Sequence, residues 1–268
     1  MSDLAIPAIP AIPAIPAVPA PPPPPRFGAG MAIAMLLLFV FAQMAVGIIV
    51  AIGGVIVTIA RHGVNDNRAL TAMFTQLGPA LILGSAVVAA AVTYFAARAW
   101  AWHLVKDRSA DGIGMVPAST RQILIGVVTG VALAGAYLAV AQLLLTPRAG
   151  TPLGPLMQIA ASGMAGRIVF GFVALFVAPP VEEFLFRGLL LKGFTVSWGA
   201  TAAGIVVSIV FITLHIPETM HYWPALVAVS ALAVATLAMR LITGSVFTSM
   251  ALHAAYNGAM VLVCFVAI

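Results

Sequence analysis

The chain alternates long stretches without charged residues with short polar segments. Four of these stretches reach the roughly 20 residues that a membrane-spanning helix needs: 31–60, 69–97, 122–147 and 241–268. Taken with the shorter apolar runs, the pattern predicts seven spans: 31–60, 77–98, 122–146, 167–192, 198–216, 223–241 and 245–267. The segment 148–166 is not apolar enough to span and is expected to lie at the interface or to re-enter the membrane. The count depends on this segment, and eight spans are the alternative.

Composition agrees with a membrane protein. Hydrophobic residues make up 63% of the 268 residues and charged residues only 7%, whereas soluble domains carry about 25% charged residues. The sequence therefore predicts an all-α, polytopic bundle whose main surroundings are lipid. The net charge of +5 would suggest a nucleic-acid partner in a soluble protein. Here twelve Lys and Arg residues spread over loops are what membrane topology requires, so no nucleic-acid partner is expected.

The first 30 residues have low complexity, with Ala-Ile-Pro repeats followed by five consecutive prolines. Such a segment is expected to be extended or disordered, as a solvated tail without a core. It lacks the basic start and apolar centre of a signal peptide. A passive spacer is the favoured interpretation, and docking of the proline run on a partner is the alternative. The chain thus divides into a tail at 1–30, N-terminal spanning helices at 31–147 and a second helical region at 148–268.

Basic residues in the short loops predict the orientation, because cytoplasmic loops carry more Lys and Arg. Seven of these residues fall on one side of the predicted membrane: Arg26, Arg98, Lys106, Arg108, Arg121, Lys192 and Arg240. Four fall on the other side: Arg61, Arg68, Arg148 and Arg167. We therefore expect a multi-pass protein of the cytoplasmic (inner) membrane with its N-terminus in the cytoplasm.

The chemistry is expected around two adjacent carboxylates, Glu182 and Glu183, which follow Pro179 and Pro180 in an apolar segment. A charge at bilayer depth costs about 3 kcal/mol or more unless it is paired or faces water, so such residues are candidates for function. A double proline breaks a preceding helix and can begin a new one. The two carboxylates are then expected in the first turn of the new helix, near its partly positive end.

Three further pairs have the i, i+4 spacing that places both side chains on one helical face: Glu183 with Arg187, Phe211 with His215, and His253 with Asn257. Counted from the nearest predicted cytoplasmic turn at about 1.5 Å per residue, Glu182 lies roughly 18 Å deep and His215 roughly 25 Å. His253 lies roughly 12 Å deep and Asn257 roughly 18 Å. All four fall near the middle of a ~30 Å hydrocarbon layer, which predicts one shared site.

Three motifs carry a family resemblance: Glu-Glu-x-x-x-Arg at 182–187, Phe-x-x-x-His at 211–215 and His-x-x-x-Asn at 253–257. They resemble the motifs of the CPBP intramembrane proteases, the CAAX-protease and bacteriocin-processing (Abi) group that includes the type II CAAX prenyl endopeptidases. The resemblance covers about residues 167–268. Patterns of other intramembrane proteases are absent from the sequence, which has no His-Glu-x-x-His, no Gly-x-Ser-Gly and no Asp in a predicted span.

The resemblance implies an intramembrane endopeptidase that cleaves a membrane-associated or prenylated (CAAX-type) protein or peptide. It implies that Glu182 activates a water as general base with help from His215. His253 and Asn257 would donate hydrogen bonds to the oxyanion. Supporting roles fall to Glu183 and Arg187, as a structural ion pair, and to Phe211.

Three alternatives stay open. Zinc could be held by Glu182, His215 and His253; the absence of closely spaced histidines favours the glutamate mechanism and no cofactor. The acid pair could serve a proton- or ion-coupled transporter, but the internal repeats typical of such proteins are not found. A scaffold or immunity partner with a vestigial site is the third alternative, and the complete set of motif residues argues against it.

Overall fold

The computed structural model describes residues 27–63, 66–104, 112–144, 161, 163–219 and 222–267. Within these ranges every regular element is helical and no strand occurs, so the predicted all-α class is confirmed. The predicted proline-rich tail up to residue 26 and most of the segment 148–166 lie outside the described residues.

The described elements follow one another as α1 (Ala29–His62), α2 (Asn67–Leu104), α3 (Thr120–Leu144), α5 (Met164–Phe172), α6 (Ala178–Glu183), α7 (Leu191–Trp198), α8 (Ala200–Leu214), α9 (Ile216–Thr219), α10 (Trp223–Thr243) and α11 (Val246–Ala267). Two π-helical segments, Val173–Val177 and Phe184–Leu190, join α5, α6 and α7 into one apolar helix of 35 residues.

The described part of the chain holds five helices long and apolar enough to cross a membrane: Ala29–His62, Thr120–Gln142, Met164–Trp198, Trp223–Thr243 and Val246–Val263. Two shorter apolar helices lie at Val87–Ala99 and Ala200–Leu214. The protein is therefore a multi-pass membrane protein. The count of seven or eight spans stays a prediction.

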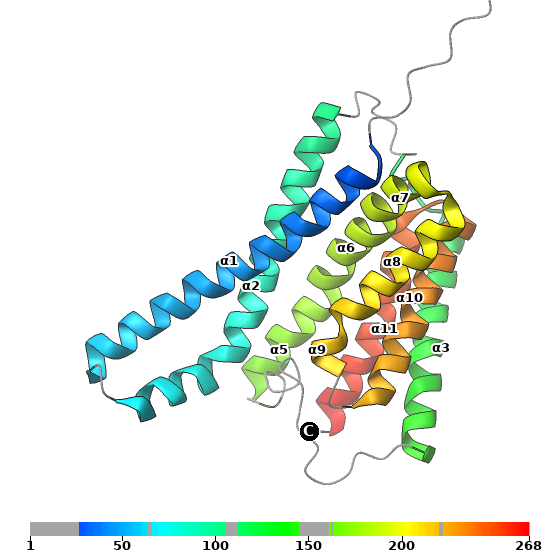
Figure 1. The fold of residues 1–268 in the computed structure, drawn as a ribbon. Coiled ribbons are helices and arrows are strands. Elements are labelled where there is room, and N and C mark those ends of the chain that lie inside the picture. Colours follow the sequence, from blue (N-terminus) through cyan, green and yellow to red (C-terminus); the bar gives the residue numbers. More distant parts are fainter. Residues whose placement is uncertain are drawn as a thin grey trace, which may run out of the picture.

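The helices are arranged around α5–α7, which run through the middle of the molecule (Figure 1). On one side lie α3, α10 and α11, and on the other the α1–α2 hairpin, which diverges from α5 and α6 toward its own turn (Figure 1). The N-terminal end of α1, the α7–α8 turn and the α10–α11 turn gather at one end of the bundle (Figure 1). This arrangement places α6, α8 and α11, which carry the predicted site residues, next to one another.

The double proline does not break its helix, contrary to the prediction. Pro179 and Pro180 lie in the first turn of α6, as is predicted for a new helical segment. The chain before α6 is also helical, however, and forms the π-helical segment Val173–Val177. A π-helical turn before a proline relieves the clash between the proline ring and the carbonyl four residues earlier, because the wider turn moves that carbonyl away, but the proline N–H is still missing. No acidic residue lies in the first turn of α6. The predicted position of Glu182 and Glu183 at a free helix N-terminus is therefore wrong.

The start of α1 is fixed to α7. The N–H of Ala29 donates to Ser197 Oγ at 2.8 Å, which satisfies one of the free donors of the first turn. Gly193 allows the two backbones to approach, because a Cβ at this position would lie 2.7 Å from the Cβ of Ala32 and 2.8 Å from the carbonyl oxygen of Gly28. The upper end of α1 is therefore an anchored part of the bundle.

The helices α3 and α11 are packed backbone against backbone along a row of small residues. Gly126, Gly130 and the fully buried Ala134 repeat every four residues on α3. A Cβ on Gly126 would lie 2.8 Å from the carbonyl oxygen of Thr248, and one on Gly130 would overlap the carbonyl oxygen of Leu252. Small residues at this spacing are how membrane helices pack closely without a hydrophobic driving force between them. The row thus holds the helix that carries His253.

We expect Gly130→Ala to destabilise the protein by about 1–3 kcal/mol, because the added methyl group must push apart two helix backbones. Gly135→Ala is the matched control on the same helix, since its Cβ would meet nothing within 4 Å; it should be neutral or stabilising by about 0.5–1 kcal/mol. Reversible unfolding in detergent micelles measures both values. Equal stability of the two variants would contradict the packing described.

Candidate active site

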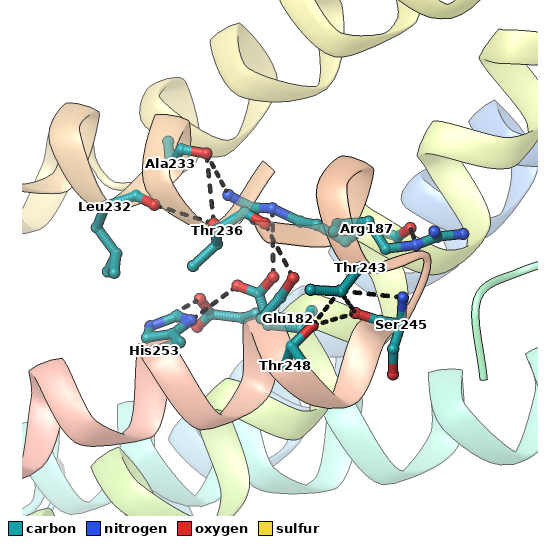
Figure 2. Close-up of polar contacts among 12 residues, drawn as sticks. Glu182, Arg187, Leu232, Ala233, Thr236, Thr243, Ser245, Thr248 and His253 are labelled. Atoms are coloured by element: carbon teal, nitrogen blue, oxygen red, sulfur yellow. Dashed lines mark hydrogen bonds and ion pairs between the residues drawn. The ribbon is translucent and has the colours of Figure 1, made fainter. Parts of the chain in front are cut away.

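Glu183 is a fully buried carboxylate at the end of α6. Its Oε2 lies 3.3 Å from Nε of Arg187, one turn later, and both side chains are 0% exposed. The contact is an ion pair whose alignment does not make a hydrogen bond. Arg187 Nη2 donates to the carbonyl oxygen of Ala233 on α10 at 3.0 Å, as Figure 2 shows. The pair therefore ties the central helix to α10.

His253 completes this network from α11. Its Nδ1 lies 2.9 Å from Oε1 of Glu183, and the residue is 3% exposed. A carboxylate can only accept, so Nδ1 carries the proton and donates. The sequence analysis paired Glu183 with Arg187 alone and missed this contact. The only available signal was the similar predicted depth of the acid pair and His253, and depth does not tell which carboxylate the ring meets.

Glu182 is the residue before Glu183 in the chain, and its side chain is 22% exposed. Its Oε2 lies 3.7 Å from Nε2 of His215 and 4.0 Å from Nε2 of His253. Both distances exceed a direct hydrogen bond, and Oε2 of Glu182 is buried without a hydrogen-bond partner among the described residues. Figure 2 shows His253 facing the Glu182 region from the neighbouring helix. Two imidazole nitrogens from different parts of the chain therefore lie within 4.0 Å of one carboxylate oxygen.

Phe211 positions His215. The Nδ1 of His215 lies 2.8 Å from the carbonyl oxygen of Phe211, one turn earlier on α8, so Nδ1 donates and Nε2 is left as the acceptor. The two rings stack with centroids 4.4 Å apart. Phe211 is fully buried and also lies 4.3 Å from the guanidinium carbon of Arg187, within the range of a cation–π contact. The aromatic ring thus connects the ion pair with the half-buried His215.

Asn257 lies one turn after His253 on α11. Its Nδ2 donates to the carbonyl oxygen of Ala174, in the first π-helical segment, at 2.8 Å. Six of the seven predicted site residues therefore lie close together. The amide nitrogen of the seventh, Asn257, is bonded to the backbone instead. The predicted role of Asn257 as an oxyanion donor stays a prediction.

The zinc alternative can be compared with this geometry. The nearest donors are Oε2 of Glu182 and the two Nε2 atoms, at 3.7 and 4.0 Å. Among the residues that the structure describes, no group of three His, Cys, Asp or Glu side chains is arranged to hold a metal ion. The described side chains therefore do not fit a zinc site.

Comparison with known families finds a match in the C-terminal part of the chain. The family described as "Type II CAAX prenyl endopeptidase Rce1-like" matches residues 164–259. These residues contain all seven predicted site residues, so the match confirms the resemblance that the three motifs indicate. No curated protein matches the chain, and no solved structure does.

We expect Arg187→Met to destabilise the protein by about 3–5 kcal/mol, because it leaves the Glu183 carboxylate buried without its cation. The double variant Glu183→Gln/Arg187→Met should regain part of this loss, since no unpaired charge then remains. Arg121→Met, at an exposed position of α3, is the control and should be within about 0.5 kcal/mol of wild type. Unfolding in detergent measures all three. A double variant no more stable than Arg187→Met would show that the charge is not the cause.

Proposed function

We propose that the protein is an intramembrane endopeptidase that hydrolyses a peptide bond of a membrane-associated or prenylated protein or peptide, with a water activated by Glu182. One observation carries the proposal: Oε2 of Glu182 is faced by Nε2 of both His215 and His253. Each imidazole has its other nitrogen bound to a fixed acceptor. The match to an endopeptidase family over these residues supports the same reaction class.

In this mechanism Glu182 is the general base. It takes a proton from the water, while the unprotonated Nε2 of His215 accepts the other hydrogen and orients the oxygen. The oxygen attacks the carbonyl carbon of the scissile bond, and its carbonyl becomes an oxyanion. Breakage of the C–N bond then requires a proton on the amine, which protonated Glu182 supplies. The low polarity of the surroundings strengthens each of these interactions.

His253 serves the oxyanion in the proposal. Its Nε2 donates a hydrogen bond only when both ring nitrogens are protonated, and the Glu183 carboxylate at Nδ1 supplies the balancing charge in that form. Glu183 also fixes the orientation of the ring. Preorganised donors of this kind are worth about 10²–10³ in kcat. The adjacent glutamates thus take separate roles, one as base and one as the support of His253.

We expect Glu182→Gln to lower kcat about 10²–10⁴-fold, because glutamine keeps the size but cannot accept the proton. Glu218→Gln replaces a glutamate outside the motifs and should keep wild-type turnover. The assay uses purified protein in detergent with a peptide library that includes farnesylated CAAX peptides. Wild-type turnover by Glu182→Gln would overturn the proposal.

The zinc-dependent protease is the alternative that the sequence leaves open, although the described side chains are not arranged to hold a metal ion. The same assay with and without a chelator separates the two candidates. Activity that persists in chelator supports the glutamate mechanism. Activity lost in chelator and restored by zinc alone supports the metal-dependent one.

We also propose that the protein lies in the cytoplasmic membrane with the N-terminal end of α1 facing the cytoplasm. Support comes from the basic residues of the sequence: Arg121, Lys192 and Arg240 lie toward the end of the bundle that holds the start of α1, whereas Arg61 lies at the opposite end (Figure 1). A partner for the proline-rich tail stays a prediction.

Cysteine labelling tests this orientation in a Cys264→Ala background. His62→Cys and Ala200→Cys place thiols at exposed positions at opposite ends of the bundle (Figure 1). In intact cells, an impermeant maleimide should label residue 62, and residue 200 only after permeabilisation. The reverse pattern would place the N-terminus outside.

A further inference from the structure

The hydrogen bond of Asn257 points to a role that differs from the predicted one. Its side-chain nitrogen donates to the carbonyl oxygen of Ala174 at 2.8 Å. Ala174 lies in the π-helical segment directly before the double proline, eight residues ahead of Glu182. The bond therefore connects the helix of His253 with the stretch of backbone that leads to the general base of the proposed mechanism.

The chain itself makes the carbonyl of Ala174 an unsatisfied acceptor. In an α-helix this oxygen would accept from the N–H of Ala178, but that N–H donates to Val173 instead. In a continued π-helix it would accept from residue 179, which is proline and has no N–H. A carbonyl left without a partner in a membrane is costly, because no water reaches it. Asn257 supplies the missing donor from another helix.

The second π-helical segment also has a carbonyl that a side chain of a neighbouring helix contacts, although here the residue five positions later is a lysine with an N–H. The carbonyl oxygen of Arg187, within Phe184–Leu190, accepts from Nε of Arg240 on α10 at 3.2 Å. Each widened segment of the central helix thus has one carbonyl that a side chain from α10 or α11 satisfies. The two bonds lie on either side of the Glu182–Glu183 pair.

We propose that Asn257 is a positioning residue that stabilises the π-helical turn before Pro179 and thereby fixes the direction of Glu182. Each residue added to or removed from a helical turn rotates the residues that follow by about 100°. Retaining the wide turn therefore decides whether Glu182 faces His215 and His253. The positioning role rests on the proposed function of Glu182; the hydrogen bond itself does not.

A double-mutant cycle with the prolines tests the proposal. Pro179→Ala restores the N–H that a π-helical bond to Ala174 requires. Pro180→Ala is the matched control, because its N–H would be six residues beyond Ala174 and cannot serve that carbonyl. Asn257→Ala is made in the wild type and in both backgrounds, and kcat, KM and the unfolding equilibrium are measured for each protein.

We expect Asn257→Ala to lower kcat about tenfold with little change in KM, in the wild type and in the Pro180→Ala background. In the Pro179→Ala background the loss should fall below about threefold, and the unfolding equilibrium should show the same rescue. Pro179→Ser provides the same N–H if Pro179→Ala does not fold.

Equal loss of kcat in all three backgrounds would overturn the proposal and favour direct oxyanion donation by Asn257. Rescue of stability without rescue of kcat would keep the bond but overturn its positioning role. If the wild type cleaves no substrate, the proposed function and the positioning role both fail. The unfolding measurements then still decide whether Asn257 compensates for Pro179.

Discussion

A carboxylate buried in the apolar interior of a membrane protein needs compensation, and Glu183 is such a group. Removing two charges from water costs several kcal/mol per ion, which good geometry and further hydrogen bonds must repay. Here Arg187 supplies the opposite charge, His253 a hydrogen bond, and a backbone carbonyl of α10 holds the far end of the guanidinium. Because these groups come from three different helices, satisfying one buried charge also sets how the helices of the site lie relative to one another.

The two adjacent glutamates show how neighbouring positions on one helix acquire different chemistry. Successive residues point about 100° apart, so Glu183 turns into the packed interior while Glu182 reaches a partly exposed volume between two imidazoles. The buried residue is held by the ion pair with Arg187 and the hydrogen bond from His253, which leaves it unsuited to proton transfer. Its neighbour has no such partners at hydrogen-bonding distance and is free to act. Environments that separate two carboxylates in this way are a known route to distinct roles.

Much of this could be predicted from the sequence. Hydropathy identified the five described helices that are long and apolar enough to cross a membrane, and the positions of Glu182, His215 and His253 along the predicted spans indicated a shared depth. What hydropathy does not encode is rotation about each helix axis. The contact between Glu183 and His253 and the bond from Asn257 to Ala174 depend on that rotation, and two π-helical segments alter it in ways that no apolar pattern reports. Gly126 and Gly130 are the sequence feature that underlies the close packing of α3 and α11. Small residues are common in membrane helices, however, and do not show which helix packs against them.

The length of α1 has a consequence for the surrounding lipid. Its 34 residues extend over about 50 Å, against a hydrocarbon layer of about 30 Å. Hydrophobic mismatch of this kind is relieved by tilting the helix or by thickening the bilayer around it. Since Ser197 and Gly193 hold the upper end of α1 against α7, a change of tilt must move its lower end away from or toward the central helix. Bilayer thickness is thereby coupled to the packing of α1 and α2 against the helix that carries Glu182.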